Sequence, residues 1–217
     1  MPHVGYWIGM SAANSPTNWD IGLSAWIVQD GNYPDFKVGQ TAEFALEFWL
    51  PEGIEPRIAI GVPSAINVGD SFYETVAEVV LQTADITILD IGVLVYRESS
   101  SSLRSLFPLG SLVAVRLGLG VDPFFYFEGL SRVAEIPPLI YSWKILSILK
   151  QTGPFIEKLA EVGPLVGSKV RIRDPQRLGY EEVLKTDAWN DDDGYAEYLL
   201  RCDLLPIAPK RDSAAST

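Results

Sequence analysis

Alternation of apolar and polar residues at every second position is the feature of this sequence that most constrains its fold. In residues 73–81, Tyr73, Ala77 and Val79 fall on one side and Glu74 and Glu78 on the other. A period of two places side chains on the two faces of a β-strand, whereas a helix needs a period of 3.6. Apolar or alternating segments at residues 21–28, 41–49, 86–96, 111–119, 124–133 and 139–149 are likewise predicted to be strands.

Clusters of turn-forming residues separate these predicted strands. They fall at residues 30–32, 51–53, 68–70, 99–102, 120–123 and 137–138. Gly, Pro, Asn, Asp and Ser favour turns because they accept or impose backbone conformations that other residues avoid. We therefore expect a mainly β protein with barrel-like or sandwich packing.

The last third of the chain is predicted to add one helix and one hairpin. Residues 155–162 place apolar side chains at helical spacing, with Pro154 near the start and Gly163 just past the end. Residues 179–189 and 195–205 flank an acidic stretch at 190–194, which predicts a hairpin with a five-residue loop. The tail from Pro206 onward is predicted to be loose.

A short motif occurs twice. Asp-Ile-Gly is found at residues 20–22 and again at 90–92, and in both cases we expect it to open a strand. A second match follows each copy, with a phenylalanine three residues before a glycine at 36–39 and 107–110. The anchors of this predicted repeat are Asp20, Gly22, Gly39, Asp90, Gly92 and Gly110.

We interpret the repeat as structural, because glycine permits the bulges and turns that small curved sheets need. The predicted organisation is a first β unit at residues 1–83 and a second, similar unit at 84–150. A C-terminal helix and hairpin at 151–205 and a tail at 206–217 complete it, unless all form one compact domain. Segments 75–82, 85–96 and 111–119, with the intervening glycine turn, resemble the first three strands of an OB-type barrel.

The charge balance limits the choice of partners. The chain has 17 Lys and Arg against 28 Asp and Glu, a formal net charge of −11. Such a surface repels nucleic acid, whose binding depends on cations that neutralise phosphates. The composition therefore disfavours nucleic acid and favours a basic protein partner.

Residue types that common catalytic sites require are scarce. Cys202 is the single cysteine, lies among leucines and is expected to be a buried, unreactive thiol. His3 is the single histidine and lies near the terminus, so neither a His-dependent triad nor a zinc site is expected. We therefore expect no metal, no cofactor and no catalytic residue, and the sequence favours a protein that is not an enzyme.

Other candidate features have solvated, non-functional alternatives. The residues at 189–200 fail the calcium-loop pattern at its first and last positions. Lys169, Arg171 and Arg173 alternate along one predicted strand, with Arg177 following, as either an anion-contacting face or a solvated one. The N-terminus lacks the features of a signal peptide, and no apolar run reaches the ~20 residues of a membrane helix. We expect a soluble, cytoplasmic protein that does not enter the membrane.

The functional hypothesis is a non-catalytic acidic protein that captures a basic protein partner, in its sharpest form an immunity- or antitoxin-like protein. The candidate binding residues are Glu43, Glu47, Asp191, Asp192 and Asp193. One alternative is a carboxylate-based enzyme or carbohydrate-type ligand barrel, which requires a deep pocket with two carboxyl groups and several aromatic rings. Another is an oligonucleotide-binding barrel.

Overall fold

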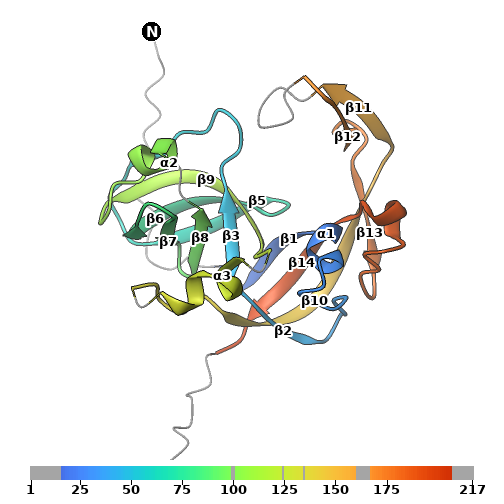
Figure 1. The fold of residues 1–217 in the computed structure, drawn as a ribbon, viewed down its shortest axis with the longest axis horizontal. Helices are drawn as coiled ribbons and strands as arrows, with labels where there is room; N and C mark the ends of the chain where they lie inside the picture. The colour runs from blue at the N-terminus through green and yellow to red at the C-terminus, as the bar shows by residue number, and fades with distance from the viewer. Residues whose placement is uncertain (1–15, 99–100, 124, 134, 160–166, 207–217) are drawn as a thin grey trace, which may run out of the picture.

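The structure is a computed structural model that describes residues 16–98, 101–123, 125–133, 135–159 and 167–206 (Figure 1). Within these residues the fold is mainly β, as predicted, with one 12-stranded sheet and one separate two-stranded sheet. None of the helices found there is long and apolar enough to cross a membrane.

The strands are β1 (Asn18–Ser24), β2 (Thr41–Phe44), β3 (Leu46–Trp49), β4 (Arg57–Ile58), β5 (Ser64–Gly69), β6 (Phe72–Gln82), β7 (Ile86–Asp90), β8 (Leu94–Glu98), β9 (Leu112–Val121), β10 (Tyr141–Thr152), β11 (Phe155–Leu159), β12 (Lys169–Arg173), β13 (Gly179–Val183) and β14 (Glu197–Leu204). The helices are α1 (Ala25–Gln29), α2 (Ser101–Leu106), α3 (Phe125–Glu128) and the 3₁₀ turns η1 (Leu130–Arg132) and η2 (Asp191–Gly194).

Five strands close into a barrel. The sheet runs β9–β3–β8–β7–β6, and an additional pairing of β6 with β9 completes the ring. Apolar side chains of these strands, among them Leu46, Phe48, Val95 and Leu117, are buried in the main hydrophobic cluster, and the Phe107 ring packs against Phe48. Five strands is also the number in an OB-type barrel, which the strand pattern resembled.

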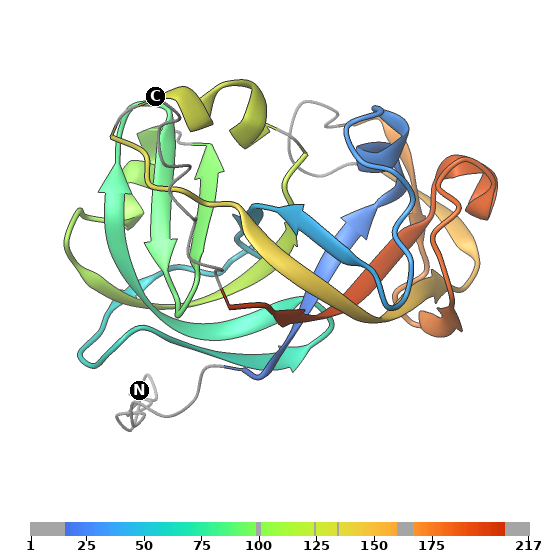
Figure 2. The same cartoon turned by 90° about the horizontal axis from the view of Figure 1, so that it is seen from below.

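Strands β4 and β5 pair with the barrel strands β9 and β6, whereas β1, β14, β10, β13 and β2 form an extension that starts at β9. Gly22 of β1 pairs with Gly120 of β9, and β1 continues through β14 to β10 and β13. Trp19, Ile145 and Cys202 are buried in this half, which lies beside the barrel in Figure 2. Burial raises the pKa of the Cys202 thiol, in keeping with the predicted inert cysteine.

A two-stranded arm projects from the end of β10. Strands β11 and β12 pair only with each other, from Phe155↔Arg173 to Leu159↔Lys169 (Figure 1). The predicted helix at 155–162 is therefore wrong for residues 155–159; residues 160–166 lie outside the described part. A short helix nucleus is costly, whereas β12 alternates strongly and offers a complete antiparallel partner.

Three further local predictions are wrong. Residues 25–28 form α1 and residues 125–132 form α3 and η1, because a short apolar run does not distinguish a buried strand from a buried helix. Asp122 accepts a hydrogen bond from the Tyr126 N–H at 3.4 Å, near the start of α3. The predicted C-terminal hairpin is absent, since β13 and β14 pair with opposite edges of β10.

The two Asp-Ile-Gly segments adopt different structures, so the expectation that each opens a strand is wrong. Residues 20–22 lie inside β1, whereas Asp90 ends β7 and its carboxylate accepts the Gly92 N–H at 2.8 Å. The second pair of anchor glycines, Gly39 and Gly110, has more similar surroundings. Gly39 (φ 82°) and Gly110 (φ 73°) each lie two residues before a strand, after a buried phenylalanine.

The duplication itself and the unit boundaries remain predictions. Strand pairs cross the boundaries proposed at residues 83 and 150, namely β6 with β9 and β1 with β14. His3 and nearly all of the tail from Pro206 onward lie outside the described residues.

Candidate functional site

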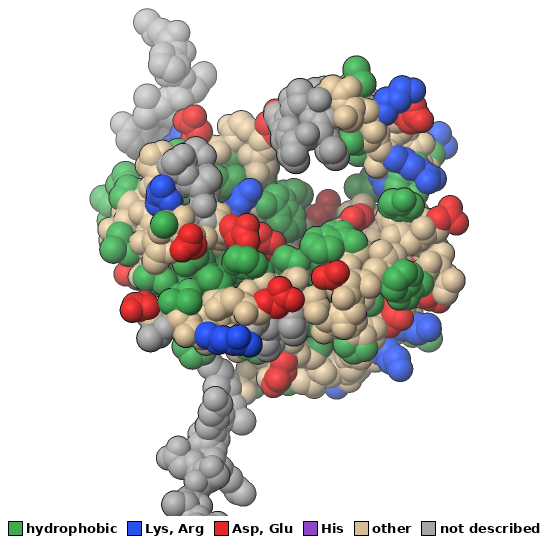
Figure 3. Space-filling view, viewed as in Figure 1, with side chains coloured by type: hydrophobic (Ala, Val, Ile, Leu, Met, Phe, Trp, Pro, Cys, Tyr) green, Lys and Arg blue, Asp and Glu red, His purple; other side chains and the backbone are tan. Residues whose placement is uncertain are grey.

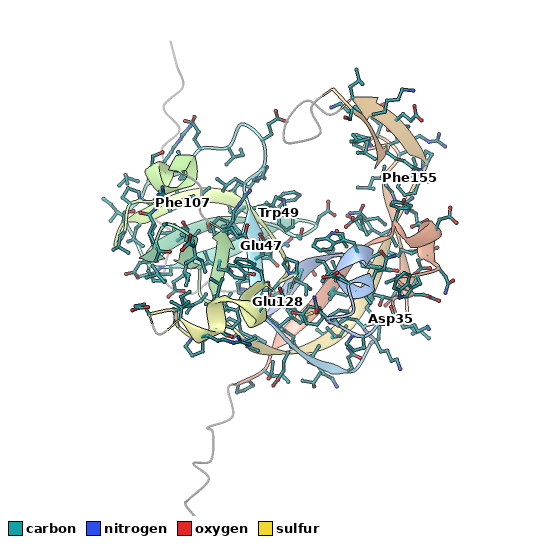
Figure 4. All side chains as sticks on the ribbon, viewed as in Figure 1. Asp35, Glu47, Trp49, Phe107, Glu128 and Phe155 are labelled. Carbon is teal, nitrogen blue, oxygen red and sulfur yellow. The ribbon has the colours of Figure 1, made fainter. Side chains whose placement is uncertain are left out.

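Strand β3 presents two side chains, Glu47 and Trp49, on the outer surface of the barrel. Leu46 and Phe48 point into the barrel and are fully buried, while Glu47 and Trp49 alternate with them and are only partly buried. β3 closes the barrel between β9 and β8, where Glu47 is in register with Gly120 and Tyr96. Figure 4 shows Glu47 and Trp49 on this strand, facing the space between the barrel and α1.

Three glycines from two neighbouring strands make room for the Trp49 indole. A Cβ placed on Gly118 would lie 2.2 Å from Trp49 Cε2, and one on Gly120 would lie 3.1 Å from Cζ3. On the far side, a Cβ on Gly22 would be 3.4 Å from Cη2. The ring therefore lies on bare backbone, a place that only glycine provides.

Trp26 lies on α1 and faces strand β3 across the same cavity. The neighbours Ala25, Ile27 and Val28 are buried and fix the helix against the core, but 53 % of Trp26 is exposed. The Ala25 N–H donates to the Ala196 carbonyl at 2.9 Å and ties the start of α1 to β14. The backbone that carries Trp26 is thus anchored, while its ring is half exposed.

Two adjoining cavities meet at Trp26 and Glu47, and together we name them the Trp26 groove. The larger, of about 420 Å³, is lined among others by Trp49, Phe72, Tyr180 and Glu197. The smaller, of about 240 Å³, lies toward α3 and is lined by Tyr96, Glu98, Pro123, Phe125 and Glu128 besides the two shared residues. Figure 3 shows hydrophobic and acidic side chains around the hollow between the barrel and the arm.

The charged side chains in the described lining of the Trp26 groove are all acidic. Its described lining contains five carboxylates and no lysine or arginine. The five are Glu47, Asp70, Glu98, Glu128 and Glu197. The potential inside a concave surface lined this way is negative and attracts cations.

Glu47 is the most strongly perturbed acid of the groove. Burial raises its pKa to about 7; nearby Arg97 opposes the shift, while Asp122 and Glu98 add to it. Asp122 is fully buried beneath the groove and accepts a hydrogen bond from the Tyr96 hydroxyl. Glu47 is therefore partly protonated near neutral pH, and an arriving cation would favour its ionised form.

Glu197 faces the groove from β14. Its two carboxylate oxygens accept from the Ser24 hydroxyl at 2.8 and 2.6 Å, which fixes the side chain at the junction of β1 and α1. Burial raises its pKa, although the Ser24 hydrogen bond and Arg173 oppose the shift. Asp70, the third acid of the larger cavity, accepts from the Tyr180 hydroxyl at 2.7 Å.

The structure separates the predicted pair Glu43 and Glu47. Ala45 interrupts the strand between them, so Glu43 lies on β2, where its carboxylate accepts from the Ser142 hydroxyl at 3.2 Å. Only Glu47 reaches the groove. The predicted alternation holds locally, but β2 pairs with β10 whereas β3 pairs within the barrel.

The acidic residues of η2 are mostly engaged within the chain. Asp191 accepts from Tyr198 Oη at 2.7 Å and from Lys150 Nζ at 3.2 Å. Burial alone would raise the pKa of Asp191, but these hydrogen bonds outweigh it, so the pKa is lowered. Asp192 pairs with Arg173. Asp192 and Asp193 have left-handed backbone, with φ of 52° and 56°. None of the three lines the Trp26 groove.

The repeat anchor Asp20 also has an internal partner. Its carboxylate accepts two hydrogen bonds from Arg201, at 2.8 and 3.0 Å, and its backbone N–H donates to Tyr73 Oη at 2.6 Å. These bonds join β1 to β14 and to β6. Within the described chain, no group of three or more His, Cys, Asp or Glu residues is arranged to hold a metal.

Sequence reasoning missed most of the groove. Trp26, Trp49 and Glu197 carry no motif, and they come together only when α1, β3 and β14 meet. One signal was available in Gly118 and Gly120, which leave one face of β9 bare beside a tryptophan-bearing strand. Comparisons with protein-family models, with curated proteins and with solved structures found no match.

Proposed function

We propose that this protein binds a basic segment of a partner protein in the Trp26 groove. The observation that carries the proposal is the joint presence of five carboxylates and an exposed tryptophan in a lining without lysine or arginine. Lysine and arginine side chains satisfy both halves of such a surface, because they pair with carboxylates and stack on aromatic faces.

The groove is suited to capture because much of it is preformed. Trp49 is held over three glycines, Glu197 is held by Ser24, and the helix that carries Trp26 is anchored by its buried residues. Side chains that are already ordered lose little entropy on binding. The net charge of −11 would also speed the approach of a basic partner. An immunity- or antitoxin-like protein that covers a basic toxin is the sharpest form of this proposal.

A second candidate is a carbohydrate-type ligand. It is favoured by one observation, the presence of Glu47 and Glu197 in a single cavity of about 420 Å³ with Trp26, Trp49 and Tyr180. Aromatic rings stack on sugars, and two carboxyl groups in one cavity are the side chains that glycoside hydrolysis uses. The oligonucleotide alternative gains nothing from the groove, whose charge repels phosphates.

Titration of tryptophan fluorescence tests the proposal. An amidated peptide of alternating Gly and Arg should bind saturably, whereas the same peptide with Gln in place of Arg, or a linear hexasaccharide, should not. Its affinity should fall as salt rises from about 25 to 200 mM, because the attraction is screened. Binding that ignores salt, or tighter binding of the sugar, would contradict the proposal.

A pair of variants locates the site. Glu47→Gln should weaken the Arg peptide about tenfold, the loss of roughly one charge-assisted hydrogen bond. Glu78→Gln is the matched control, since Glu78 is an exposed strand residue of the barrel outside every groove cavity. Equal effects of the two variants would show that only the net charge matters.

A further inference from the structure

A third cavity adjoins the Trp26 groove on the side of the arm. It has a volume of about 550 Å³ and shares Trp26, Gln151 and Glu197 with the larger groove cavity. We name it the arm pocket. Its other lining residues include Phe155, Arg171, Arg173 and Tyr195, so the charge changes sign along one continuous surface.

The two arginines of this pocket are ordered by one ring. The guanidinium carbons of Arg171 and Arg173 each lie 4.2 Å from the centroid of Phe155. The register of the arm explains this, because Phe155 pairs with Arg173 and residue 157 pairs with Arg171, which places all three on one face. Stacking on an aromatic ring holds a guanidinium in place with its donors available at the edge.

The two arginines differ in their ion pairing. Arg173 is only 9 % exposed, pairs with Asp192 and donates to the Gly153 carbonyl at 2.6 Å. Its Nε lies buried without an acceptor among the described residues. Arg171 is exposed, and no carboxylate of the described chain lies within ion-pair distance of it. Glu157, its neighbour across the arm, pairs with Lys169 instead.

We propose that the arm pocket binds a carboxylate of the same partner segment whose basic residue occupies the Trp26 groove. The carboxylate is either an acidic side chain or a free C-terminus, and Arg171 receives it with its planar pair of donors. The inference rests on the proposed function and makes it more specific, because the preferred segment then carries both a basic and an acidic group.

Charge alone predicts the opposite result, which makes the test sharp. An added acidic residue lowers the positive charge of a peptide and should weaken its attraction to a protein of net charge −11. A gain in affinity therefore requires a local site for the carboxylate.

The experiment uses fluorescein-labelled, amidated Gly-Arg peptides that carry one Glu placed two, four or six residues after the last Arg. These spacings cover about 7 to 20 Å of extended chain. Matched peptides carry Gln at the same position, and a third set ends in a free carboxylate without Glu. At one spacing, the Glu or free-acid peptide should bind about fivefold to tenfold tighter than its Gln or amide counterpart.

Variants assign the gain to the arm pocket. Arg171→Gln should abolish it, Arg171→Lys should keep only part of it, and Phe155→Leu should reduce it by removing the stacking partner. Arg177→Gln is the control, because Arg177 does not line the pocket and the substitution removes the same charge as Arg171→Gln. A gain that survives Arg171→Gln would overturn the inference.

Failure of the two proposals can be told apart. If the parent Gly-Arg peptide binds but Glu and Gln peptides bind alike at every spacing, the arm-pocket inference is wrong and the proposed function stands. If the parent peptide does not bind, both are wrong. If only the free-acid peptide gains, the ligand is a C-terminus, and if only the Glu peptides gain, it is a side chain.

Discussion

The barrel wall and the arm bound the same hollow, but they are built differently. Strand β3 carries Glu47 and Trp49 and is paired on both sides, with β8 and β9. The arm carries Phe155 and Arg171 on two strands that pair only with each other. The wall is part of the core, whereas the arm depends on its own few contacts.

Their charges differ in the same way. Glu47 is partly desolvated, and burial is the largest of the causes that raise its pKa to about 7. The arm's Lys169 and Glu157 side chains are 74 % and 66 % exposed, so solvent screens their ion pair. The difference shows that burial decides how strongly the surroundings of a charged group change its ionisation. The following predictions test this contrast.

Hydrogen exchange should show the largest difference. Backbone amides of β11 and β12 should exchange about 100-fold or more faster than those of β3 and β9, because an isolated two-stranded sheet opens easily. Strand β13 is the matched control, since it is also an edge strand but pairs with β10 in the large sheet. Equal protection of the arm and β9 would show that the two regions unfold as one unit.

Among the residues of the barrel wall, the glycines that contact the Trp49 ring should tolerate substitution least. Gly118→Ala places a methyl group 2.2 Å from the indole, so the ring must move. We expect a loss of about 2 kcal/mol in the free energy of unfolding, typical of overpacking, and weaker peptide binding. Denaturant unfolding measures the first effect, and titration with the Gly-Arg peptide measures the second.

Gly129→Ala provides the control for that variant. A Cβ at Gly129 meets its nearest neighbour, the Phe125 carbonyl oxygen, at an ordinary 3.8 Å. Its stability and binding should stay close to those of the parent. An unchanged Gly118→Ala variant would mean that Trp49 is not held by its contact with β9.

The pH dependence of peptide binding should reflect Glu47 of the barrel wall and no group of the arm. Protonation removes the charge of Glu47 as Glu47→Gln does, so the affinity of the Gly-Arg peptide should rise about tenfold in total as pH increases through about 7, and then level off. Glu47→Gln should flatten this profile. A profile that keeps its slope in the variant would assign the titration to another group.

The same group makes stability depend on pH in the opposite direction. The folded pKa of Glu47 lies above its ordinary value of 4.5, so the folded state binds more protons between these values. Its contribution is present below about 4.5 and lost as pH rises through about 7. Parent and Glu47→Gln unfolding curves at a series of pH values should therefore converge at the acidic end.

The exposed ion pair of the arm should have the smallest effect. Glu157→Gln removes the partner of Lys169, and we expect a change below about 0.5 kcal/mol in the free energy of unfolding. Thermal unfolding measures it. A loss above about 1 kcal/mol would show that the arm is stabilised by its surface charges after all.

Local features of this protein could be predicted from the sequence. The alternation at 73–81 became β6, and within the segment expected as a strand at 41–49, Glu47 alternates with the buried Leu46 and Phe48. The glycines at 39 and 110 adopt the left-handed backbone expected of turn residues. Cys202 is buried, as its leucine neighbours indicated. Each of these follows from residues that lie close together in the chain.

The site was not predictable in the same way. One signal was misleading: residues 155–159 have helical spacing, and only pairing with β12 made them a strand. Glu47 was a candidate, but so was Glu43, and nothing local distinguishes them. The difference arises because β2 and β3 find different partner strands.

The sequence by itself determined which residues alternate, where turns form and what net charge the surface carries, because these depend on side-chain chemistry and near neighbours. Tertiary structure alone decided that Gly22, Gly118 and Gly120 lie under Trp49, and that Trp26, Glu47 and Glu197 share one groove. Strand pairing is set by the summed burial of distant residues, and no short segment records its partner.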